Sequence, residues 1–415
     1  MKPKIVFLCH FSSIFVRKHL RLKSHVFRHW LFKVLHRTGF QYHDFAIWVS
    51  DYIEEFKKNT DFEYHIVAPH KGMKHQIETF CEEGIHYHFY KCDGSLLYDA
   101  LNAKFHWDEK NDFKHNRTLI AKIVNTISPQ LVCLCGAENP YYSLGVLEVR
   151  DVPIYVILQT LLNDELRATY NVSSPYRREK ELIVFSHAKY FSTASKKAID
   201  VIRAVNNDAI ILPSGFPTHR PRVLECDKQY DFMFFARSVS KNKGIEDYLK
   251  AVSIVSNYFP SVHCGVIGSC EASYRSRLDK IISDNKINDN VSFLGLFDSV
   301  DKAYTEVKKS KVLVLPSITA ALNSTVREGM LMGQPVICYQ NDAIDRINEH
   351  ERCIITARYR DVEDLASKMK ESLEHPEVTT QIGYNALDYS NHHFSNEVIV
   401  RKLLENSQLI IEKRI

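Results

Sequence analysis

Two basic side chains in the second half of this 415-residue chain have the spacing needed to bind a diphosphate. Arg237 and Lys243 follow a short apolar run and precede Gly244, so we expect a strand that ends in a positively charged loop. Arginine binds phosphate through two parallel hydrogen bonds and lysine supplies a point charge, so the pair suits a diphosphate. The alternative interpretation is that these cations are only solvated surface groups.

A second loop follows the predicted strand 312–315 and leads into a helix that we expect to begin near Ser324. The free backbone N–H groups and the dipole at such a helix start favour an anion. Glu328 falls about one turn into this helix, where a carboxylate can accept both hydroxyls of a ribose. The alternative is that Ser324 or Thr325 only caps the helix and that Glu328 only favours its dipole.

These loops must be positioned by the elements around them. Short apolar strands alternate with helices in two successive parts of the chain. This alternation predicts an α/β protein with two Rossmann-like, doubly wound domains that face each other across a cleft. We expect the first domain at 1–216, the second at 217–390, and a C-terminal helix at 391–415 that crosses back to the first domain. The predicted strands are 4–8, 64–68, 85–90, 131–135, 153–158, 210–213, 232–236, 262–267, 291–294, 312–315 and 336–339. The main predicted helices are 45–58, 115–127, 244–259, 274–285, 298–309, 324–332 and 362–373.

Composition excludes several other classes of protein. Hydrophobic residues make up 45% and charged residues 25% of the chain, which is typical of globular proteins and not of disordered or fibrous ones. A length of 415 residues exceeds the roughly 250–300 residues of a single core. A net charge of +4 is too small to indicate a nucleic-acid binder. The ten cysteines lack metal-ligand spacing, which favours reduced, buried thiols in a cytosolic protein.

The N-terminal region is unusual in charge, because no acidic residue occurs between Met1 and Asp44. Basic residues alternate there with large apolar ones, which is typical of a helix that lies on an anionic membrane. Each basic residue near such a surface contributes about 1 kcal/mol, so reversible attachment is expected. The alternative is a helix whose apolar side joins the core. The basic residues are Arg17, Lys18, Arg21, Lys23, Arg28, Lys33 and Arg37.

The second half of the chain resembles the donor domain of family 4 glycosyltransferases, which are retaining, nucleotide-sugar-dependent enzymes with the GT-B fold. Arg237 and Lys243 match the diphosphate-binding pair of that family in order and spacing. The predicted strand 291–294 resembles the one before its nucleobase pocket, which would place Leu296 and Phe297 beside the base. The later family block is matched by Pro316, Ser317, Glu328, Met330, Gly333 and Pro335. The resemblance assigns catalysis to Arg237, Lys243 and Glu328, and donor binding to Asn323, Ser324, Thr325, Leu296, Phe297, Gly268 and Ala320.

The chain departs from the family pattern at four places. Ala320 stands where the family has a glutamate that holds hydroxyls of the donor sugar, a contact worth ~1.5–3 kcal/mol. Leu322 and Asn323 replace a Phe-Gly pair, and asparagine tolerates the positive φ that glycine allows. Gln159 stands where a histidine often follows the strand 153–158, and the early Gly-Gly loop is absent. The acceptor-side residues are expected to be His10, Gln159 and Arg17.

The resemblance implies transfer of a sugar, with retention, from a nucleoside-diphosphate sugar to a saccharide or lipid-linked acceptor. Synthesis of a surface polysaccharide, such as capsule or lipopolysaccharide, is the expected role. We expect no cofactor, no metal and no nucleic-acid partner, because the cations can replace a metal and no Asp-x-Asp motif occurs. The first residues lack the long apolar core and small-residue cleavage site of a signal peptide, and no uninterrupted run of roughly 18 apolar residues occurs, so we expect neither a signal peptide nor a transmembrane helix. We therefore expect a cytoplasmic protein that can attach to the inner face of the plasma membrane.

Two alternatives on the same fold remain open. A non-catalytic GT-B protein would keep the nucleotide site and use it for regulation, and Ala320 is the residue in its favour. A nucleotide-sugar epimerase would act without an acceptor.

Overall fold

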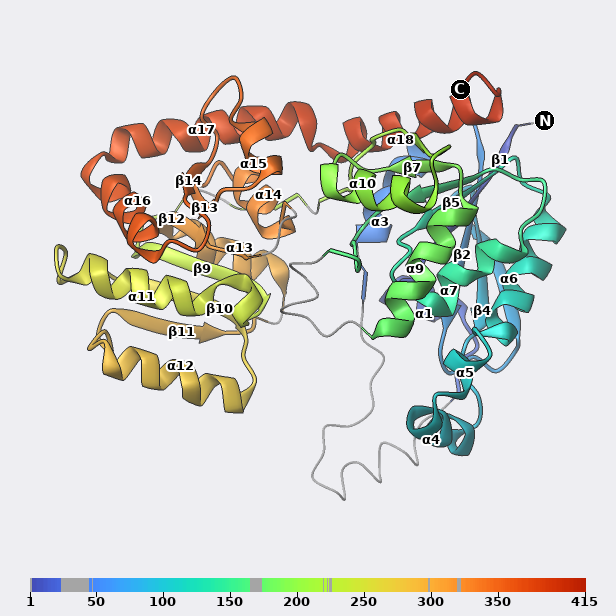
Figure 1. Ribbon diagram of the computed structural model, residues 1–415, viewed down its shortest axis with the longest axis horizontal. Helices are drawn as coiled ribbons and strands as arrows, with labels where there is room; N and C mark the ends of the chain where they lie inside the picture. The colour runs from blue at the N-terminus through green and yellow to red at the C-terminus, as the bar shows by residue number, and fades with distance from the viewer. Residues whose placement is uncertain are drawn as a thin grey trace. The chain divides into compact units, whose positions relative to one another are not determined.

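The chain forms two compact α/β units, each a doubly wound, Rossmann-like domain (Figure 1). The computed structural model describes residues 2–23, 45–46, 48–164, 174–218, 220–221, 223, 226–297, 299–318 and 322–415. Unit 1 contains the described residues of Met1–Ala168, Val172–Pro217 and Asn396–Ile415, and unit 2 contains those of Thr218–Ser395. The chain therefore leaves unit 1, builds unit 2, and returns to finish unit 1.

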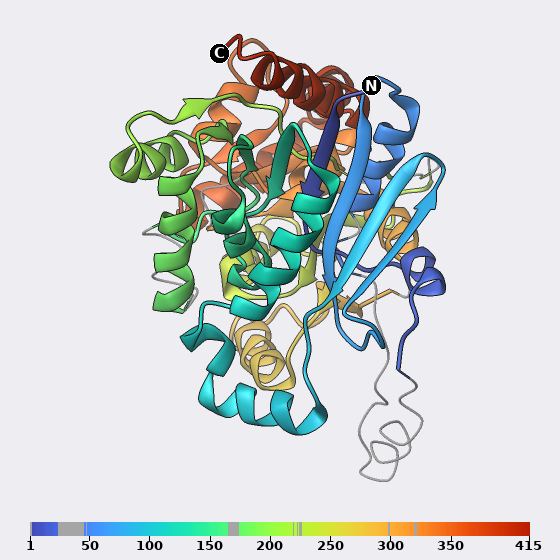
Figure 2. The ribbon, with the colours of Figure 1, turned by 90° about the vertical axis from the view of Figure 1, so that its right-hand side faces the viewer.

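Unit 1 is built on an eight-stranded sheet with the order β3-β4-β2-β1-β5-β6-β7-β8. Buried runs such as Lys4–Leu8 (β1) and Leu131–Cys135 (β5) form its centre, where both faces of a strand are covered and every residue can be apolar. Figure 2 shows β2 between β1 and β4 in the blue part of the colour scale. One face packs on α3 and α18, and the other packs on α6 and α9.

The pairings are parallel except for the edge strand β3, which runs antiparallel to β4. The remaining elements of unit 1 are α1 (Ile14–His19), α3 (Trp48–Lys58), β2 (Glu63–His70), β3 (Ile77–Glu82), β4 (Ile85–Lys91), α4 (Leu96–Phe105), α5 (Trp107–Lys110), α6 (Lys114–Ile127), α7 (Pro140–Ser143), the 3-10 helix η1 (Leu144–Glu148), β6 (Ile154–Ile157), α9 (Pro175–His187), β7 (Tyr190–Ser192), α10 (Lys196–Val205), β8 (Ile210–Ile211) and α18 (Asn396–Ile411).

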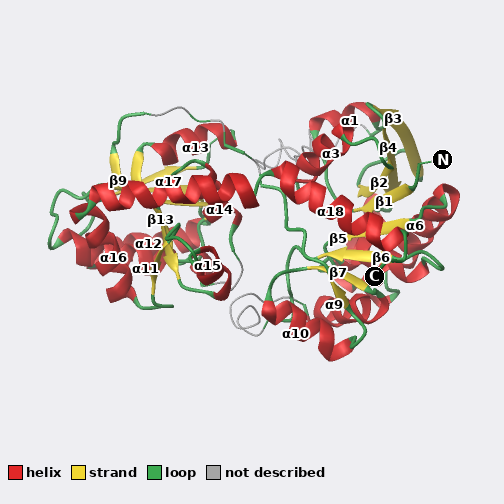
Figure 3. Ribbon diagram, turned by 90° about the horizontal axis from the view of Figure 1, so that it is seen from above, coloured by secondary structure: helices red, strands yellow, loops and turns green. Residues whose placement is uncertain are grey.

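Unit 2 is built on a six-stranded parallel sheet with the order β11-β10-β9-β12-β13-β14. Its core is one cluster of buried side chains between the sheet and the helices on its two sides (Figure 3). Because crossover connections are right-handed, the helices that precede and follow the reversal in strand order lie on opposite faces. α11 and α16 pack on each other, whereas α14 packs on α17.

The elements of unit 2 are β9 (Tyr230–Ser238), the 3-10 helix η2 (Lys241–Lys243), α11 (Ile245–Ser256), β10 (Cys264–Ser269), α12 (Ala272–Asp284), β11 (Val291–Gly295), α13 (Val300–Lys308), β12 (Ser310–Leu315), α14 (Ser324–Leu331), β13 (Val336–Tyr339), α15 (Asp342–Ile347), β14 (Ile355–Ala357), α16 (Val362–Glu374) and α17 (Pro376–His393). Within the residues described in both units, no helix combines the length and apolarity that a membrane span requires.

Candidate functional site

Each sheet has one point where its strand order reverses direction. In unit 1 the chain moves outward from β1 to β2 and β4, and then returns to place β5 on the other side of β1. In unit 2 it moves outward from β9 to β10 and β11, and returns to place β12 on the other side of β9. Ligands of open α/β sheets bind outside the carboxyl ends of the two strands at such a switch point. The loops after β9 and β12, and those after β1 and β5, are therefore the candidate sites.

At the switch point of unit 2, the two loops are tied together by contacts of Lys243 and Asn242. The Lys243 Nζ donates to the Asn323 side-chain oxygen at 2.6 Å, which joins the loop after β9 to the start of α14. The Asn242 carbonyl accepts from the Ser317 hydroxyl and from the Ile318 backbone N–H, each at 3.2 Å. The amine of Lys243 is thereby held at the N-terminus of α14, where it adds a full charge to the helix dipole.

Gly244 makes this close approach of the two loops possible. Its φ is +79°, and a Cβ there would lie 1.9 Å from the backbone oxygen of Pro316. Any other residue would strain the backbone and push the two loops apart. Gly244 thus sets how near Lys243 comes to the loop after β12.

Glu328 lies on the second turn of α14, is partly buried, and has an unusual protonation equilibrium. Burial raises the pKa of its carboxyl to about 7. The nearby charges of Arg327 and Lys243 and the hydroxyls of Tyr304 and Ser324 act in the opposite direction and favour the ionised form. The carboxylate therefore belongs to the same electrostatic environment as the amine of Lys243, and it changes charge near neutral pH.

The other donor-side residues lie on the same carboxyl edge. Arg237 is exposed near the end of β9, and its carbonyl accepts from the Ser269 hydroxyl at 2.8 Å. Gly268, in β10, is buried next to that contact. Leu296 follows β11 and is 65% exposed, whereas Phe297 packs against the core of unit 2. Asn323 is the N-cap residue of α14, and Ser324 and Thr325 begin the helix.

At the switch point of unit 1, the loop after β1 carries His10 in an aromatic environment. Its ring stacks on Phe45 with centroids 5.5 Å apart, and it also contacts Tyr142 at 5.2 Å and Tyr141 at 5.9 Å. Burial lowers the pKa of His10 to about 4, so the imidazole is neutral at pH 7. Its Nδ1 is buried without a hydrogen-bond partner.

Gln159, after β6, lies beside an acid that the sequence did not single out. In the amide orientation that satisfies both neighbours, its nitrogen donates to Glu138 Oε1 at 3.1 Å and its oxygen accepts from Trp48 Nε1 at 3.1 Å. Glu138 follows β5 and is only 6% exposed. The sequence signal for it was a glutamate two residues past a glycine that ends a buried strand.

Gly136 positions this acid by a second close approach. Its φ is +86°, and a Cβ there would lie 2.6 Å from a carboxylate oxygen of Glu138 and 2.8 Å from the hydroxyl of Tyr142. A larger residue would displace the Glu138 side chain from its present position.

Arg17, the third residue expected on the acceptor side, contacts the wall of this region. Its Nη1 donates to the Ser12 hydroxyl at 2.8 Å, and that hydroxyl lies 3.2 Å from His70 Nε2. The basic residues Arg28, Lys33 and Arg37, and also Ala320, lie outside the described residues, so the expectations for them stay predictions.

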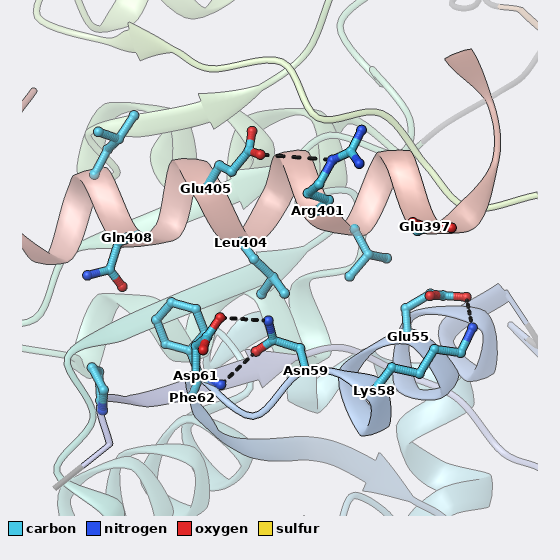
Figure 4. A pocket seen from close by; sticks show the side chains of 13 residues that line it. Glu55, Lys58, Asn59, Asp61, Phe62, Glu397, Arg401, Leu404, Glu405 and Gln408 are labelled. Carbon is cyan, nitrogen blue, oxygen red and sulfur yellow. Dashed lines mark hydrogen bonds and ion pairs between the residues drawn. The ribbon is translucent and has the colours of Figure 1, made fainter. Parts of the chain in front are cut away.

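A groove in unit 1 lies at the opposite edge of the sheet, between α3 and α18 (Figure 4). It has a volume of about 940 Å³ and is lined by Pro3 and Phe62, which directly precede β1 and β2. Its charges are largely paired, as between Lys58 and Glu55 at 2.7 Å. Because it lies at the amino ends of the strands, we do not place the site there.

The residues described in the two units contain no group of three or more His, Cys, Asp or Glu side chains arranged to hold a metal ion. The cations of unit 2 are the groups available there to balance a diphosphate.

Comparison with known proteins found a family model that matches part of the chain. Residues 218–388 match the family model described as "Glycosyl transferases group 1". An uncharacterized glycosyltransferase of Methanocaldococcus jannaschii is 23% identical over 212 residues, which cover 49% of this chain and 56% of that protein. An uncharacterized glycosyltransferase of Haemophilus influenzae is 23% identical over 141 residues, covering 34% of this chain and 38% of that protein. The chain thus spans about half, or less, of the length of these relatives.

Solved structures resemble the whole chain. Sucrose-phosphate synthase from Thermosynechococcus elongatus superimposes with a TM-score of 0.70 and 13% identity, and covers 100% of both chains. The Anabaena protein HepE, in complex with UDP and glucose, has a TM-score of 0.64 and 14% identity, and covers 98% of this chain and 99% of that one. At these identities the likeness establishes the fold alone, which is that of two doubly wound, Rossmann-like α/β domains.

Proposed function

We propose that this chain is a glycosyltransferase that transfers a sugar, with retention, from a nucleoside-diphosphate sugar to a saccharide or lipid-linked acceptor. The observation that carries the proposal is the switch point of unit 2. There the amine of Lys243 is bonded to Asn323 at the start of α14, and the Glu328 carboxyl lies one turn further along that helix. Cations, free N–H groups and an acid are the groups that a nucleoside diphosphate requires.

In this proposal each group has one task. Glu328 accepts the hydroxyls of the ribose. Arg237, Lys243 and the N–H groups that begin α14 stabilise the charge that grows on the leaving diphosphate, and electrostatic stabilisation of this kind is usually the largest catalytic contribution. The bond from the anomeric carbon to the diphosphate breaks, a bond from that carbon to the acceptor oxygen forms on the same face, and the acceptor proton passes to the leaving phosphate.

The finer features of the proposal have separate support. HepE, which has a similar fold, was solved with UDP and glucose, so a UDP-hexose is the first donor to test. A role in capsule or lipopolysaccharide synthesis, metal independence, and a position at the inner membrane surface rest on the sequence resemblance and on the basic residues of 17–37.

A thermal-shift panel of UDP-, GDP-, ADP- and CMP-sugars tests the donor site directly. A ligand at 100 times its Kd stabilises the folded state by about 2.7 kcal/mol, which raises the melting temperature of a unit of this size by roughly 5–10 °C. We expect one base class to give this shift and Lys243→Ala to abolish it. If no nucleotide sugar raises the melting temperature of the wild-type protein, our assignment of the donor site is wrong.

A non-catalytic nucleotide-binding protein is the second candidate, and Ala320 in place of the family's glutamate favours it. Binding without transfer or hydrolysis of any donor would support this candidate. Ala320→Glu sharpens the choice, because a gain of activity on a common hexose donor would show that the missing carboxylate limits donor use and not the reaction itself.

A further inference from the structure

The basic N-terminal region suggests a positively charged site in unit 1, but the loops at the switch point of unit 1 contain no lysine or arginine. The chain carries no lysine or arginine in the segments 9–13, 136–143 and 158–164, which follow β1, β5 and β6. These three strands are neighbours in the sheet, so their carboxyl ends lie side by side. The polar side chains there include His10, Glu138, Asn139 and Gln159.

Among the described residues, the arginines Arg17 and Arg177 reach this region and already make contacts. Lys197 also reaches it, and its amine lies 3.7 Å from Asp164. Arg17 donates to the Ser12 hydroxyl at 2.8 Å. Arg177 donates to the backbone oxygen of Glu138 at 2.7 and 3.0 Å and to the side chain of Asn139 at 2.9 Å. Both guanidinium groups therefore serve to hold the loops in place.

The remaining polar groups suit hydroxyls and not phosphates. Glu138 presents a carboxylate that can only accept hydrogen bonds when ionised, and a phosphate would be repelled by it. His10 is neutral, and its buried Nδ1 has no hydrogen-bond partner. Gln159 is exposed and contributes an amide.

The apolar surroundings also suit a sugar ring. The rings of Phe45, Tyr141 and Tyr142 lie around His10, and Trp48 donates to Gln159. Aromatic faces pack against the C–H groups of a sugar, while acids and amides bind its hydroxyls. Phe45 is one of the large apolar side chains that remain exposed.

We propose that the switch point of unit 1 binds an uncharged, hydroxyl-bearing group, so that the acceptor ends in a neutral sugar and not in a phosphate or an acidic sugar. Glu138 and His10 bind its hydroxyls, and Gln159 holds the Glu138 carboxylate in position. This inference rests on the proposed glycosyltransferase function and names the acceptor class of that reaction.

Paired probes that differ only in one phosphate group test this choice of acceptor class. Saturation-transfer NMR with UDP present compares methyl hexosides with the corresponding methyl hexoside 6-phosphates for binding to the wild-type protein. We expect the neutral glycosides to bind at least tenfold more tightly. Tighter binding of the phosphates, or no binding of any neutral glycoside, would overturn the proposal.

Three variants assign the effect to this site. Glu138→Gln should weaken glycoside binding about tenfold and leave the nucleotide-induced thermal shift unchanged. The matched control Glu82→Gln removes the same charge from the edge strand β3. It should change neither glycoside binding nor the nucleotide-induced thermal shift. Gln159→Lys adds a cation at an exposed position and should shift the preference toward the 6-phosphates. An unchanged preference in both Glu138→Gln and Gln159→Lys would contradict the assignment.

The two proposals fail in distinguishable ways. If no nucleotide sugar binds, the glycosyltransferase function is wrong whatever the glycosides do. If a nucleotide sugar binds but the acceptor preference is anionic, only the acceptor class is wrong.

Discussion

The two switch points occupy the same topological position in their sheets and have opposite chemistry. In unit 2 the edge carries Arg237 and the Lys243–Asn323 contact at a helix start. In unit 1 the corresponding edge carries the neutral imidazole of His10 and the carboxylate of Glu138 among aromatic rings. This difference is the basis of our proposals that the edge in unit 2 binds an anion and the edge in unit 1 binds an uncharged polar group.

This comparison also shows how a doubly wound sheet can serve different ligands. The strands fix where two loops meet, and the loop residues fix what binds there. Variants that alter one edge at a time therefore test whether the two edges bind different ligands. We expect the largest loss of activity from variants at the start of α14.

Removing the amine of Lys243 should have the largest effect. Lys243→Ala takes away a charge that is held at the start of α14, and we expect kcat/KM to fall at least tenfold. Glu328→Ala should have a loss of similar size, because the ribose loses its acceptor. Turnover of the preferred nucleotide sugar measures both.

The matched control is Lys241→Ala, which removes the same charge from the same 3-10 turn at an exposed position. We expect less than a threefold change for it. Equal losses in Lys241→Ala and Lys243→Ala would mean that only the overall charge of the loop matters.

The two glycines should differ in their effect on stability. Gly244→Ala and Gly136→Ala both place a Cβ at positive φ, which costs ~1–2 kcal/mol in each case. In Gly244→Ala the Cβ also meets a backbone carbonyl, whereas in Gly136→Ala it meets the ends of two side chains. We therefore expect a larger fall in melting temperature for Gly244→Ala, as measured by calorimetry. A larger fall for Gly136→Ala would show that the contact between the two loops of unit 2 is loose.

The pH dependence of donor binding should follow Glu328. Its pKa is raised to about 7, so the ionised form that accepts the ribose hydroxyls increases as pH rises from 6 to 8. We expect donor affinity to rise several-fold over this range in the wild type and to be weak and flat in Glu328→Gln. The same raised pKa means that ionisation destabilises the folded state above pH 4.5, so Glu328→Gln should melt at a higher temperature than the wild type at pH 8.

Acid should affect unit 1 before unit 2. Burial lowers the pKa of His10, His65, His70 and His88, which all lie in unit 1. A lowered pKa means that the unfolded chain binds the proton first, so stability present above pH 6.5 is lost as the pH falls toward 4. For His10 this loss is on the order of 3 kcal/mol.

The tryptophans make this difference measurable, because all three, at positions 30, 48 and 107, belong to the sequence of unit 1. Tryptophan fluorescence should report an acid transition at a higher pH than far-UV circular dichroism of the whole chain. His10→Gln should move the fluorescence transition to lower pH, while the control His263→Gln in unit 2 should not. Coincident transitions would contradict the assignment.

The sequence predicted the longer buried strands well, and missed a polar edge strand and very short strands. Strands 131–135 and 336–339 are confirmed with the same bounds, because a fully buried strand is a continuous apolar run. Asp361 caps α16, and its side chain accepts from the Asp364 N–H at 2.9 Å. Gly333 follows α14 in a left-handed conformation, with a φ of +63°.

The missed strands have two physical explanations: a polar edge position and a very short length. β3 is a polar edge strand, joined to β4 by a turn at Glu83 and Gly84, so it shows no apolar run. β7 and β14 have only three residues each. The predicted helix 45–58 begins at Trp48, because Phe45 forms a bridge with Ser12 instead.

For the candidate site, the residues that lie within one motif could be identified from the sequence, and the contacts between motifs could not. The Lys243–Asn323 bond joins residues 80 positions apart, and it depends on β9 and β12 being neighbours. Glu138 was missed for the same reason, since nothing near it in the chain shows that Gln159 and Trp48 meet it.

The return of α18 to unit 1 has a consequence for biosynthesis. Val400, Leu403 and Leu404 are part of the core of unit 1, and the Asn406 side chain donates to the hydroxyl of Tyr155. A ribosome adds ~5–20 residues per second, so β1 waits at least about 20 s for the helix that covers it. Unit 2 is continuous from Thr218 to Ser395 and can complete its fold during that interval. The nascent N-terminal half therefore emerges with uncovered apolar surface, and a chaperone that holds it until translation passes residue 411 would improve the yield of native protein.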